Sequence, residues 1–390
     1  MNIVKSSIAI LALSFSISAC TPPVPPEFQA ELAERYVTCV SGEIAISAAP
    51  ELAEVTQAWV DGISESCSDL SATIIGAVDD TGTVVDVTET AADVFITAPG
   101  QTSSCDVASS SPVGIDAVAI VVNVAGLDGV IFSPALLHRT LSGGMASWAD
   151  PELQELNPEI QLPDTPVVLR APTRPQDITS LSDWMNRLDP AGWPGSPSGL
   201  VSDEAFSSEL VLEELAIEGT IAIVPASLVT NNSLATISIQ SQQAQEPAYL
   251  TVESVISAGT QMVESTSGSV VTAKLDAALP PVPAAGNDVA SIPWQALNQF
   301  TITVCAGANE MAGRAFAKYA LRLDSQGSMT YFGFTETPMK IRVAGVAAVS
   351  QGLPEPSIPP SGAPEEVPAN GTTEMPLEEE TQMAIPEPTP

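Results

Sequence analysis

The stretch from Leu141 to Trp193 places the strongest constraint on how this chain can fold. Within it, Asp150-Pro151-Glu152 is typical of a helix start, because Asp caps helix N-termini and Pro fits the first helical position. The apolar run 167–169 predicts a short strand ending at Arg170, and a second helix is expected over about 177–188. An arginine delivered by a strand to a helix N-terminus is an arrangement by which open α/β sheets hold anionic ligands.

This stretch resembles the phosphate-binding proteins of ABC transporters. The residues that match keep the family's spacing over about thirty positions: Trp148, Asp150, Pro151, Asn157, Pro158, Leu162, Pro163 and Arg170. The resemblance covers roughly residues 35–345 and is strongest in 127–193 and 294–338. It implies an α/β, two-lobed periplasmic-binding-protein-like fold of type II, with lobes joined by crossing strands and a ligand held in the interlobe cleft.

The ligand loop departs from the family pattern. After its arginine the family has Gly-Ser-Gly-Thr, whereas this chain has Thr173-Arg174-Pro175-Gln176-Asp177. The resemblance implies that Arg170, Thr173 and Arg174 contact a small anion, phosphate or a related oxyanion, because a guanidinium fork suits an oxyanion. The alternative role for either arginine is an ion pair with a carboxylate of this acidic chain.

Three further cleft positions follow from the same resemblance. Ser47 lies where the family has a Gly-rich, Thr-containing loop, Asp79 where it has a phosphate-binding Ser, and Thr97 where it has the Asp that accepts a proton from phosphate. A carboxylate at Asp79 would repel a dianion. Inorganic phosphate is therefore expected to bind more weakly than in family members that keep these residues.

The chain divides into two expected lobes. Residues 37–120 together with 300–350 form lobe I, and residues 121–299 form lobe II. The near-continuous apolar run 112–124 predicts a buried strand that crosses between them. Further strands are expected over 39–47, 70–76, 219–224, 234–239 and 294–304, and further helices over 50–65, 207–215, 249–264 and 310–323.

Both ends of the chain differ from the folded part. Residues 1–20 have the pattern of a lipoprotein signal peptide, with Lys5 before an apolar segment and Cys20 in a lipobox-like Ile-Ser-Ala-Cys. Acylated Cys20 would anchor the protein on the extracytoplasmic face of a membrane, in the periplasm or at the cell surface; the alternative is an ordinary secretory signal. Residues 21–36 are expected to be a Pro-rich linker, and 351–390 a disordered Pro/Glu-rich tail.

Four cysteines remain after Cys20: Cys39, Cys67, Cys105 and Cys305. An even number in an exported protein favours two disulfides, for which three pairings exist. We prefer Cys67 with Cys105, because one follows the first helix and the other follows the third strand of the same lobe. No metal-like Cys spacing occurs, so neither a metal nor another cofactor is expected.

Composition limits the function classes. Lys+Arg 12 against Asp+Glu 47 gives a net charge of −35, which argues against nucleic acid as a partner. His138 is the single histidine and is expected to be structural, and no motif supplies an activated nucleophile, so no enzyme is expected. The expected protein is a monomeric, lipid-anchored solute-binding protein that serves a membrane ABC permease. The alternative is a degenerate, non-transport member of the fold that acts as an envelope interaction or scaffold module.

Overall fold

The computed structural model describes residues 26–75, 92–202, 206–241, 246–283 and 287–354. Predictions made for the signal peptide, Cys20, Asp79 and the tail beyond residue 354 lie outside these ranges. Across the described residues, no helix combines the length and the apolar character that a bilayer crossing needs.

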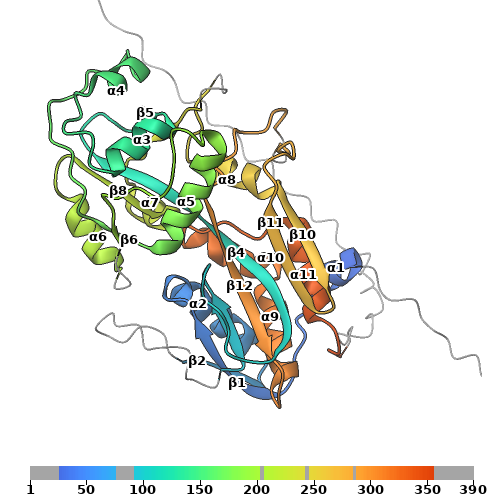
Figure 1. Cartoon of the computed structure of the whole chain (residues 1–390). Coiled ribbons are helices and arrows are strands. Elements are labelled where there is room, and N and C mark those ends of the chain that lie inside the picture. The colour runs from blue at the N-terminus through green and yellow to red at the C-terminus, as the bar shows by residue number, and fades with distance from the viewer. Residues whose placement is uncertain (1–25, 76–91, 203–205, 242–245, 284–286, 355–390) are drawn as a thin grey trace, which may run out of the picture. The chain divides into compact units, whose positions relative to one another are not determined.

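One large sheet organises the described chain (Figure 1). Its strand order is β10-β11-β4-β12-β3-β1-β2, and β8 pairs with β4 beside this path. The strands are β1 Gly42–Ala48, β2 Leu70–Ile74, β3 Val94–Thr97, β4 Val107–Asn123, β8 Thr220–Pro225, β10 Met262–Ser267, β11 Val270–Leu275 and β12 Leu297–Cys305. β1, β2 and β3 pair in parallel, whereas β12 is antiparallel to both β3 and β4.

Strand β4 is the long element that crosses the molecule. It has 17 residues, and its first part pairs with β12 up to Ala117 while its last part, from Val118, pairs with β8. Residues 109–122 are buried, as expected for a strand covered on both faces. The predicted apolar crossing strand is therefore present and extends further toward the N-terminus.

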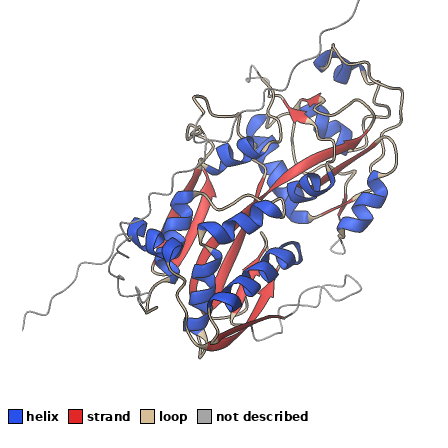
Figure 2. Cartoon of the chain, turned by 180° about the vertical axis from the view of Figure 1, so that it is seen from behind, coloured by secondary structure: helices blue, strands red, loops and turns tan. Residues whose placement is uncertain are grey.

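The first hydrophobic core surrounds β1, β3 and the N-terminal part of β4. Helices line this part of the sheet. In Figure 2, where the molecule is seen from behind, these helices lie over the strands. The helices are α1 Pro26–Arg35, α2 Ala53–Ser66 with a preceding 3-10 turn η1 at Pro50–Leu52, α9 Glu310–Ala320, α10 Leu323–Tyr331 and α11 Met339–Val349. Trp59, Phe300 and Phe316 are buried in or beside this core. Helix α1 lies in a segment for which the sequence predicted only a linker, and its Ala33 is fully buried.

The second core surrounds the other end of β4. Its helices are α3 Pro134–Leu141, α4 Pro151–Leu156, α5 Pro175–Leu188, α6 Ser208–Leu215, α7 Ala226–Asn232 and α8 Val252–Gly259, and its short strand pairs are β5 Ile131–Phe132 with β9 Ser238–Ile239 and β6 Pro172–Thr173 with β7 Val201–Ser202. Four tryptophans are buried here: Trp148, Trp184, Trp193 and Trp294. His138 packs edge to face on Trp193, with ring centroids 5.2 Å apart.

Two local predictions were wrong. Residues 167–169 do not form a strand; Val168 makes an isolated bridge to Thr220 instead. The helix expected over 249–264 ends at Gly259, and residues 262–275 form the β10–β11 hairpin, whose Val270 pairs with Ser110 of β4. The hairpin thus extends the sheet beside the first part of β4.

The disulfide pairing also differs from the preferred one. Cys39 is bonded to Cys67 and Cys105 to Cys305, with Cα–Cα distances of 5.4 and 5.7 Å. Strand register explains both pairs. Gly42 pairs with Leu70, and each of the first two cysteines lies three residues before one of these positions. Cys305 pairs directly with Val107, two residues after Cys105.

Candidate functional site

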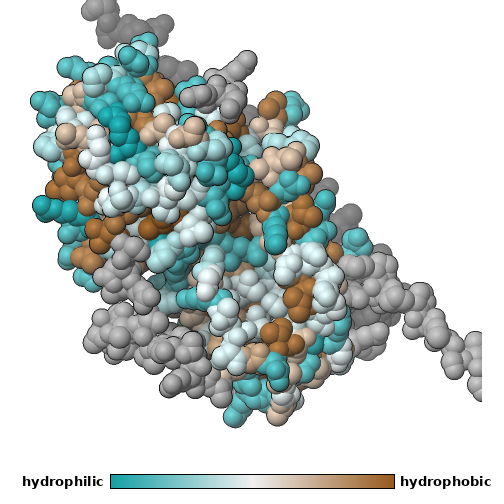
Figure 3. All heavy atoms as spheres, in the orientation of Figure 1, coloured by the Kyte–Doolittle hydropathy of each residue, from teal (hydrophilic) through white to brown (hydrophobic). Residues whose placement is uncertain are grey.

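A cavity of about 320 Å³ lies between residues of the two cores. Glu51, Glu54, Phe332 and Phe334 line it from the side of the first core. The side of the second core contributes Arg174, Phe206, Ser208, Pro225, Ser227, Leu228 and Asn231. A volume of this size is within the range of sites for small solutes. The face of the molecule shown in Figure 3 mixes hydrophilic and hydrophobic residues.

Arg174 is the buried cation of this cavity. It lies at the N-cap position of α5, directly after β6, and only 5% of it is exposed. Its Nε and Nη2 donate to the two oxygens of Asp177 at 2.8 and 2.9 Å, and its Nη1 donates to Oε1 of Glu51 at 2.7 Å. Burial alone would lower the pKa of Arg174, but the charge and hydrogen bonds of Asp177, followed by Glu51, raise it above its ordinary value. The side chain is therefore a permanent cation.

The bonds to these carboxylates leave part of each group unused. A guanidinium carries five N–H groups, and three of those of Arg174 have partners in the described residues. Oε1 of Glu51 also accepts from Nε2 of Gln176 at 3.3 Å. The other oxygen of Glu51, Oε2, is buried and has no hydrogen-bond partner among the described residues. Both partners of this ion pair thus retain capacity for a further hydrogen bond.

Polar side chains of β12 and α5 hold Asp177 behind the arginine. Nδ2 of Asn298 donates to Oδ1 of Asp177 at 2.6 Å, and Oγ of Ser180 donates to Oδ1 of Asn298 at the same distance. Asp177 is fully buried. Its position is therefore fixed by groups on both sides, and it in turn fixes the orientation of the guanidinium plane.

A second buried carboxylate, Asp116, lies on β4 near the arginine. The backbone N–H of Ser227 donates to its Oδ1 at 3.1 Å, and the Ser227 hydroxyl donates to its Oδ2 at 2.8 Å. Burial raises the pKa of Asp116 to about 7, although the charge of Arg174 and the bonds from Ser227 oppose the shift. Asp116 therefore titrates near neutral pH. It does not line the cavity itself, but its hydrogen-bond partner Ser227 does.

The site residues expected from sequence are only partly brought together here. Arg174 lines the cavity, whereas Arg170 is exposed and has no ion pair in the described part of the chain. Thr173 is buried beside Arg174, with its hydroxyl lacking a described partner. Ser47 is buried in β1, and the hydroxyl of Thr97 donates to the Thr301 carbonyl at 3.4 Å. Neither Ser47 nor Thr97 lines the cavity, and Asp79 lies outside the described residues.

Sequence reasoning missed Glu51, Asp116 and Ser227. Asp116 carried a usable signal, because it is an acid in the middle of the apolar run 112–124, where a carboxylate must find partners. Glu51 lies three residues after the end of β1, in the loop beyond the strand, which is a usual place for ligand residues in an open α/β sheet. Within the described ranges, no group of three or more His, Cys, Asp or Glu residues is arranged to hold a metal ion.

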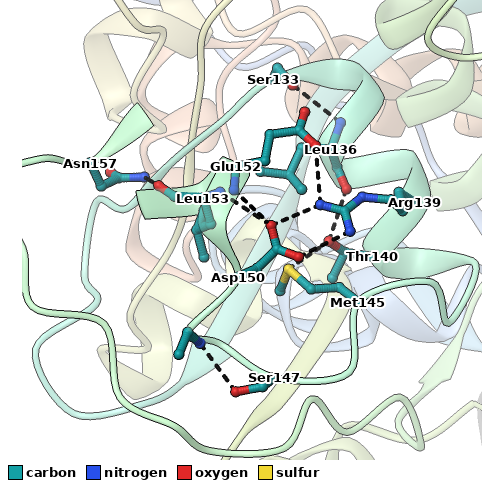
Figure 4. Close-up of polar contacts among 11 residues, drawn as sticks. Ser133, Leu136, Arg139, Thr140, Met145, Ser147, Asp150, Glu152, Leu153 and Asn157 are labelled. Carbon is teal, nitrogen blue, oxygen red and sulfur yellow. Dashed lines mark hydrogen bonds and ion pairs between the residues drawn. The ribbon is translucent and has the colours of Figure 1, made fainter. Parts of the chain in front are cut away.

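The motif that carries the family resemblance serves the structure around α4. Asp150 caps α4 by accepting from the N–H groups of Glu152 and Leu153, and both its oxygens accept from Arg139 at 2.8 and 3.0 Å (Figure 4). Arg139 also contacts Glu152. Asp150 thus lies at the centre of a local network that ties α3 to the start of α4.

Two other motif residues also make internal hydrogen bonds. The Trp148 indole donates to the Gly219 carbonyl at 3.0 Å. The Asn157 amide accepts from the backbone N–H of Ile131 and donates to the carbonyls of Ile131 and Leu153, at 2.8 to 2.9 Å. None of these motif residues lines the cavity. These motif residues therefore make contacts within the fold and lie outside the lining of the cavity.

Two α/β cores that share strand β4, with a polar cavity between residues of both, form the two-lobed α/β fold expected from the sequence. Solved structures agree with this fold. The ancestral soluble variant of the human phosphate-binding protein matches with a TM-score of 0.51 and 13% identity, over 78% of this chain and 93% of that chain. A DING protein matches with a TM-score of 0.50 and 12% identity, over 77% and 93%.

Sequence comparison identifies a more specific resemblance. Phosphate-binding protein PstS 3 of Mycobacterium leprae (strain TN) is 27% identical over 154 residues, which are 37% of this chain and 41% of the relative, so the match spans less than half of either protein. No protein-family model matches the chain. The expected resemblance to phosphate-binding proteins is confirmed, as a distant similarity over part of the chain.

Proposed function

We propose that this protein is an extracytoplasmic solute-binding protein that holds a small oxyanion-bearing solute in the cavity between its cores. The observation that carries this proposal is the position of Arg174, a buried guanidinium at the N-terminus of a 14-residue helix and in the wall of that cavity. A helix N-terminus favours negative charge, and a guanidinium fork matches an oxyanion. The N-terminus of α5 and the Arg174 guanidinium therefore act on the same part of the cavity wall.

The carboxylates around Arg174 restrict which oxyanion can bind. Glu51 already accepts from the guanidinium and is held on the first core. Each pair of like unit charges at about 4 Å costs about 4 kcal/mol at an effective dielectric near 20. A phosphate dianion beside Glu51 is therefore disfavoured unless Glu51 moves away. This supports the expectation that inorganic phosphate is a poor ligand.

The partners follow from the resemblance. A lipid anchor at Cys20 would hold the protein on the outer face of a membrane, and the solute would be passed to an ABC permease in that membrane. The two disulfides are consistent with an oxidising, extracytoplasmic compartment.

Calorimetry on the purified protein tests the proposal, with phosphate, sulfate and a set of small organic phosphates and phosphonates as ligands. At least one should bind, and Arg174→Lys should weaken that binding at least tenfold, because a point charge cannot replace a bidentate fork. Arg170→Lys is the matched control and should leave binding unchanged. If no oxyanion binds the wild type, the solute-binding proposal is wrong.

That result would favour the second candidate, a non-transport scaffold role. The observation behind it is that Asp177 and Glu51 already neutralise Arg174. In such a protein the same residues would be only an internal brace between the cores.

A further inference from the structure

The charges that line the cavity do not complement a simple anion. Arg174 contributes one positive charge, whereas Glu51 and Glu54 contribute two negative charges to the same wall. Asp177, behind the arginine, is the second carboxylate bonded to the same guanidinium, after Glu51. The cavity wall therefore carries more negative than positive charge. A ligand with only hydrogen-bond acceptors can bind Arg174, but it offers no donor to Glu51 or Glu54.

One carboxylate oxygen of this wall lacks a donor. Oε2 of Glu51 is buried without a hydrogen-bond partner among the described residues, and only 18% of the Glu51 side chain is exposed. Glu54, three residues further along the chain, is exposed and makes no ion pair in the described part of the chain. A buried carboxylate oxygen in this state is stabilised by a donor, above all by a charged one. A bound ammonium group would supply it.

The rest of the wall also suits a cation. Phe206, Phe332 and Phe334 line the cavity, and the Phe206 ring already lies 5.3 Å from the Arg174 guanidinium carbon. Aromatic faces attract ammonium and guanidinium groups through the ring quadrupole. Acidic and aromatic groups therefore lie in the same cavity as the single arginine.

We propose that the solute is a zwitterion, an aminoalkyl phosphate or phosphonate, whose oxyanion binds Arg174 and whose ammonium group binds between Glu51, Glu54 and the phenylalanine rings. This inference rests on the proposed function, because it names the ligand class of that same cavity. Glu51 is then the residue that determines specificity. It accepts from the ammonium group of a zwitterion and repels a bare dianion, so it selects between the two ligand classes.

The test compares a zwitterionic ligand with ligands that lack either its amine or its phosphate. Calorimetry on the purified protein uses 2-aminoethyl phosphate, ethyl phosphate, inorganic phosphate and ethanolamine. We expect 2-aminoethyl phosphate to bind at least tenfold more tightly than each of the other three. Glu51→Gln should remove this preference and strengthen binding of ethyl phosphate, whereas Glu65→Gln, an exposed position on the same helix α2, should change neither.

Each other outcome counts against the inference. If ethyl phosphate binds as tightly as 2-aminoethyl phosphate, the zwitterion inference is wrong and the proposed function stands. If ethanolamine alone binds as tightly, the oxyanion contact is wrong. If neither the wild type nor Glu51→Gln binds any of the phosphates, the proposed function fails together with the inference. The wild-type ligand series gives these answers even where a variant does not fold.

Discussion

Nη1 of Arg174 lies 2.7 Å from Oε1 of Glu51, although 123 residues separate them in the chain. This contact joins the start of α5 in one core to the turn before α2 in the other. The Glu51 carboxylate thus already accepts a hydrogen bond from the Arg174 guanidinium that a bound oxyanion could accept in its absence. Any anionic solute must compete with Glu51 or bind to the remaining N–H groups of Arg174.

Removing Arg174 should destabilise the protein strongly. Arg174→Ala leaves Asp177 buried without its counter-ion, and breaking a buried ion pair in this way costs about 3 to 5 kcal/mol of unfolding free energy. Arg170→Ala is the matched control, and it should cost less than about 0.5 kcal/mol because that side chain is exposed. Urea denaturation measures both, and equal effects would contradict the structural assignment of the two arginines.

Asp116 should make stability depend on pH. Its pKa is raised from 3.8 to about 7 by burial, so between these values the folded state binds a proton that the unfolded state has lost. The free energy of unfolding should therefore fall as the pH rises from about 4 to about 7, by about 4 kcal/mol at most, and then level off.

Asp116→Asn should flatten this dependence, because an amide does not titrate. The control is Asp128→Asn, an exposed carboxylate that also accepts from a backbone N–H, at 3.1 Å, and this variant should keep the wild-type slope. Denaturation series at pH 5, 6, 7 and 8 measure the slopes. An unchanged slope in Asp116→Asn would rule out Asp116 as its source.

The two disulfides should differ in their contribution. In the chain-entropy model, a cross-link over 28 residues stabilises by about 3.5 kcal/mol and one over 200 residues by about 5 kcal/mol. The variant Cys105→Ser/Cys305→Ser should therefore unfold at lower urea than Cys39→Ser/Cys67→Ser. Peptide mapping of the unreduced protein checks the pairing itself, and a Cys67–Cys105 peptide would contradict it.

Gly219 should not tolerate a side chain. Its φ is +89°, and a Cβ would lie 2.2 Å from the carbonyl oxygen of Pro166, so Gly219→Ala must move the backbone that also accepts the Trp148 indole. We expect a cost of about 3 kcal/mol or more. Gly126 has φ +81° and open space, so Gly126→Ala carries only the positive-φ cost, about 1 kcal/mol. Similar costs for both would show that the clash at Gly219 is relieved.

Cys20→Ala tests the proposed anchor. If acyl chains on Cys20 are the membrane attachment, the variant should appear in the soluble fraction, whereas Cys39→Ala, which breaks a disulfide, should remain with the membranes. Fractionation followed by immunoblotting measures this. A Cys20→Ala protein that still sediments with membranes would argue against the lipoprotein interpretation.

Most elements of the fold could be predicted because their local signals agree with their final environment. The buried run 112–124 and the caps at Asp150 and Ser207 each act over a few residues. The β10–β11 hairpin was missed, although Gly268-Ser269 is a turn signal, because the preceding apolar pattern was extended as a helix to residue 264. Three β-branched or apolar residues at 167–169 were too few to decide a strand.

The candidate site was less predictable, because its contacts join distant parts of the chain. The resemblance pointed to both Arg170 and Arg174, and of these two only Arg174 is buried and lines the cavity. Spacing alone could not reveal that Glu51 would meet Arg174, or that Ser227 would satisfy Asp116. A buried acid such as Asp116 can be recognised from its apolar neighbours, yet its partner becomes known only when β8 and α7 are in place beside β4.

Strand β4 has a consequence for how the protein loses its structure. Its residues up to Ala117 complete the first sheet region, and those from Val118 onward pair with β8 of the second. Full opening of either core would break backbone hydrogen bonds of β4, and the other core also depends on this strand. Unfolding should therefore be a single cooperative event, and the amide hydrogens of residues 115–121 should be among the last to exchange with solvent deuterium.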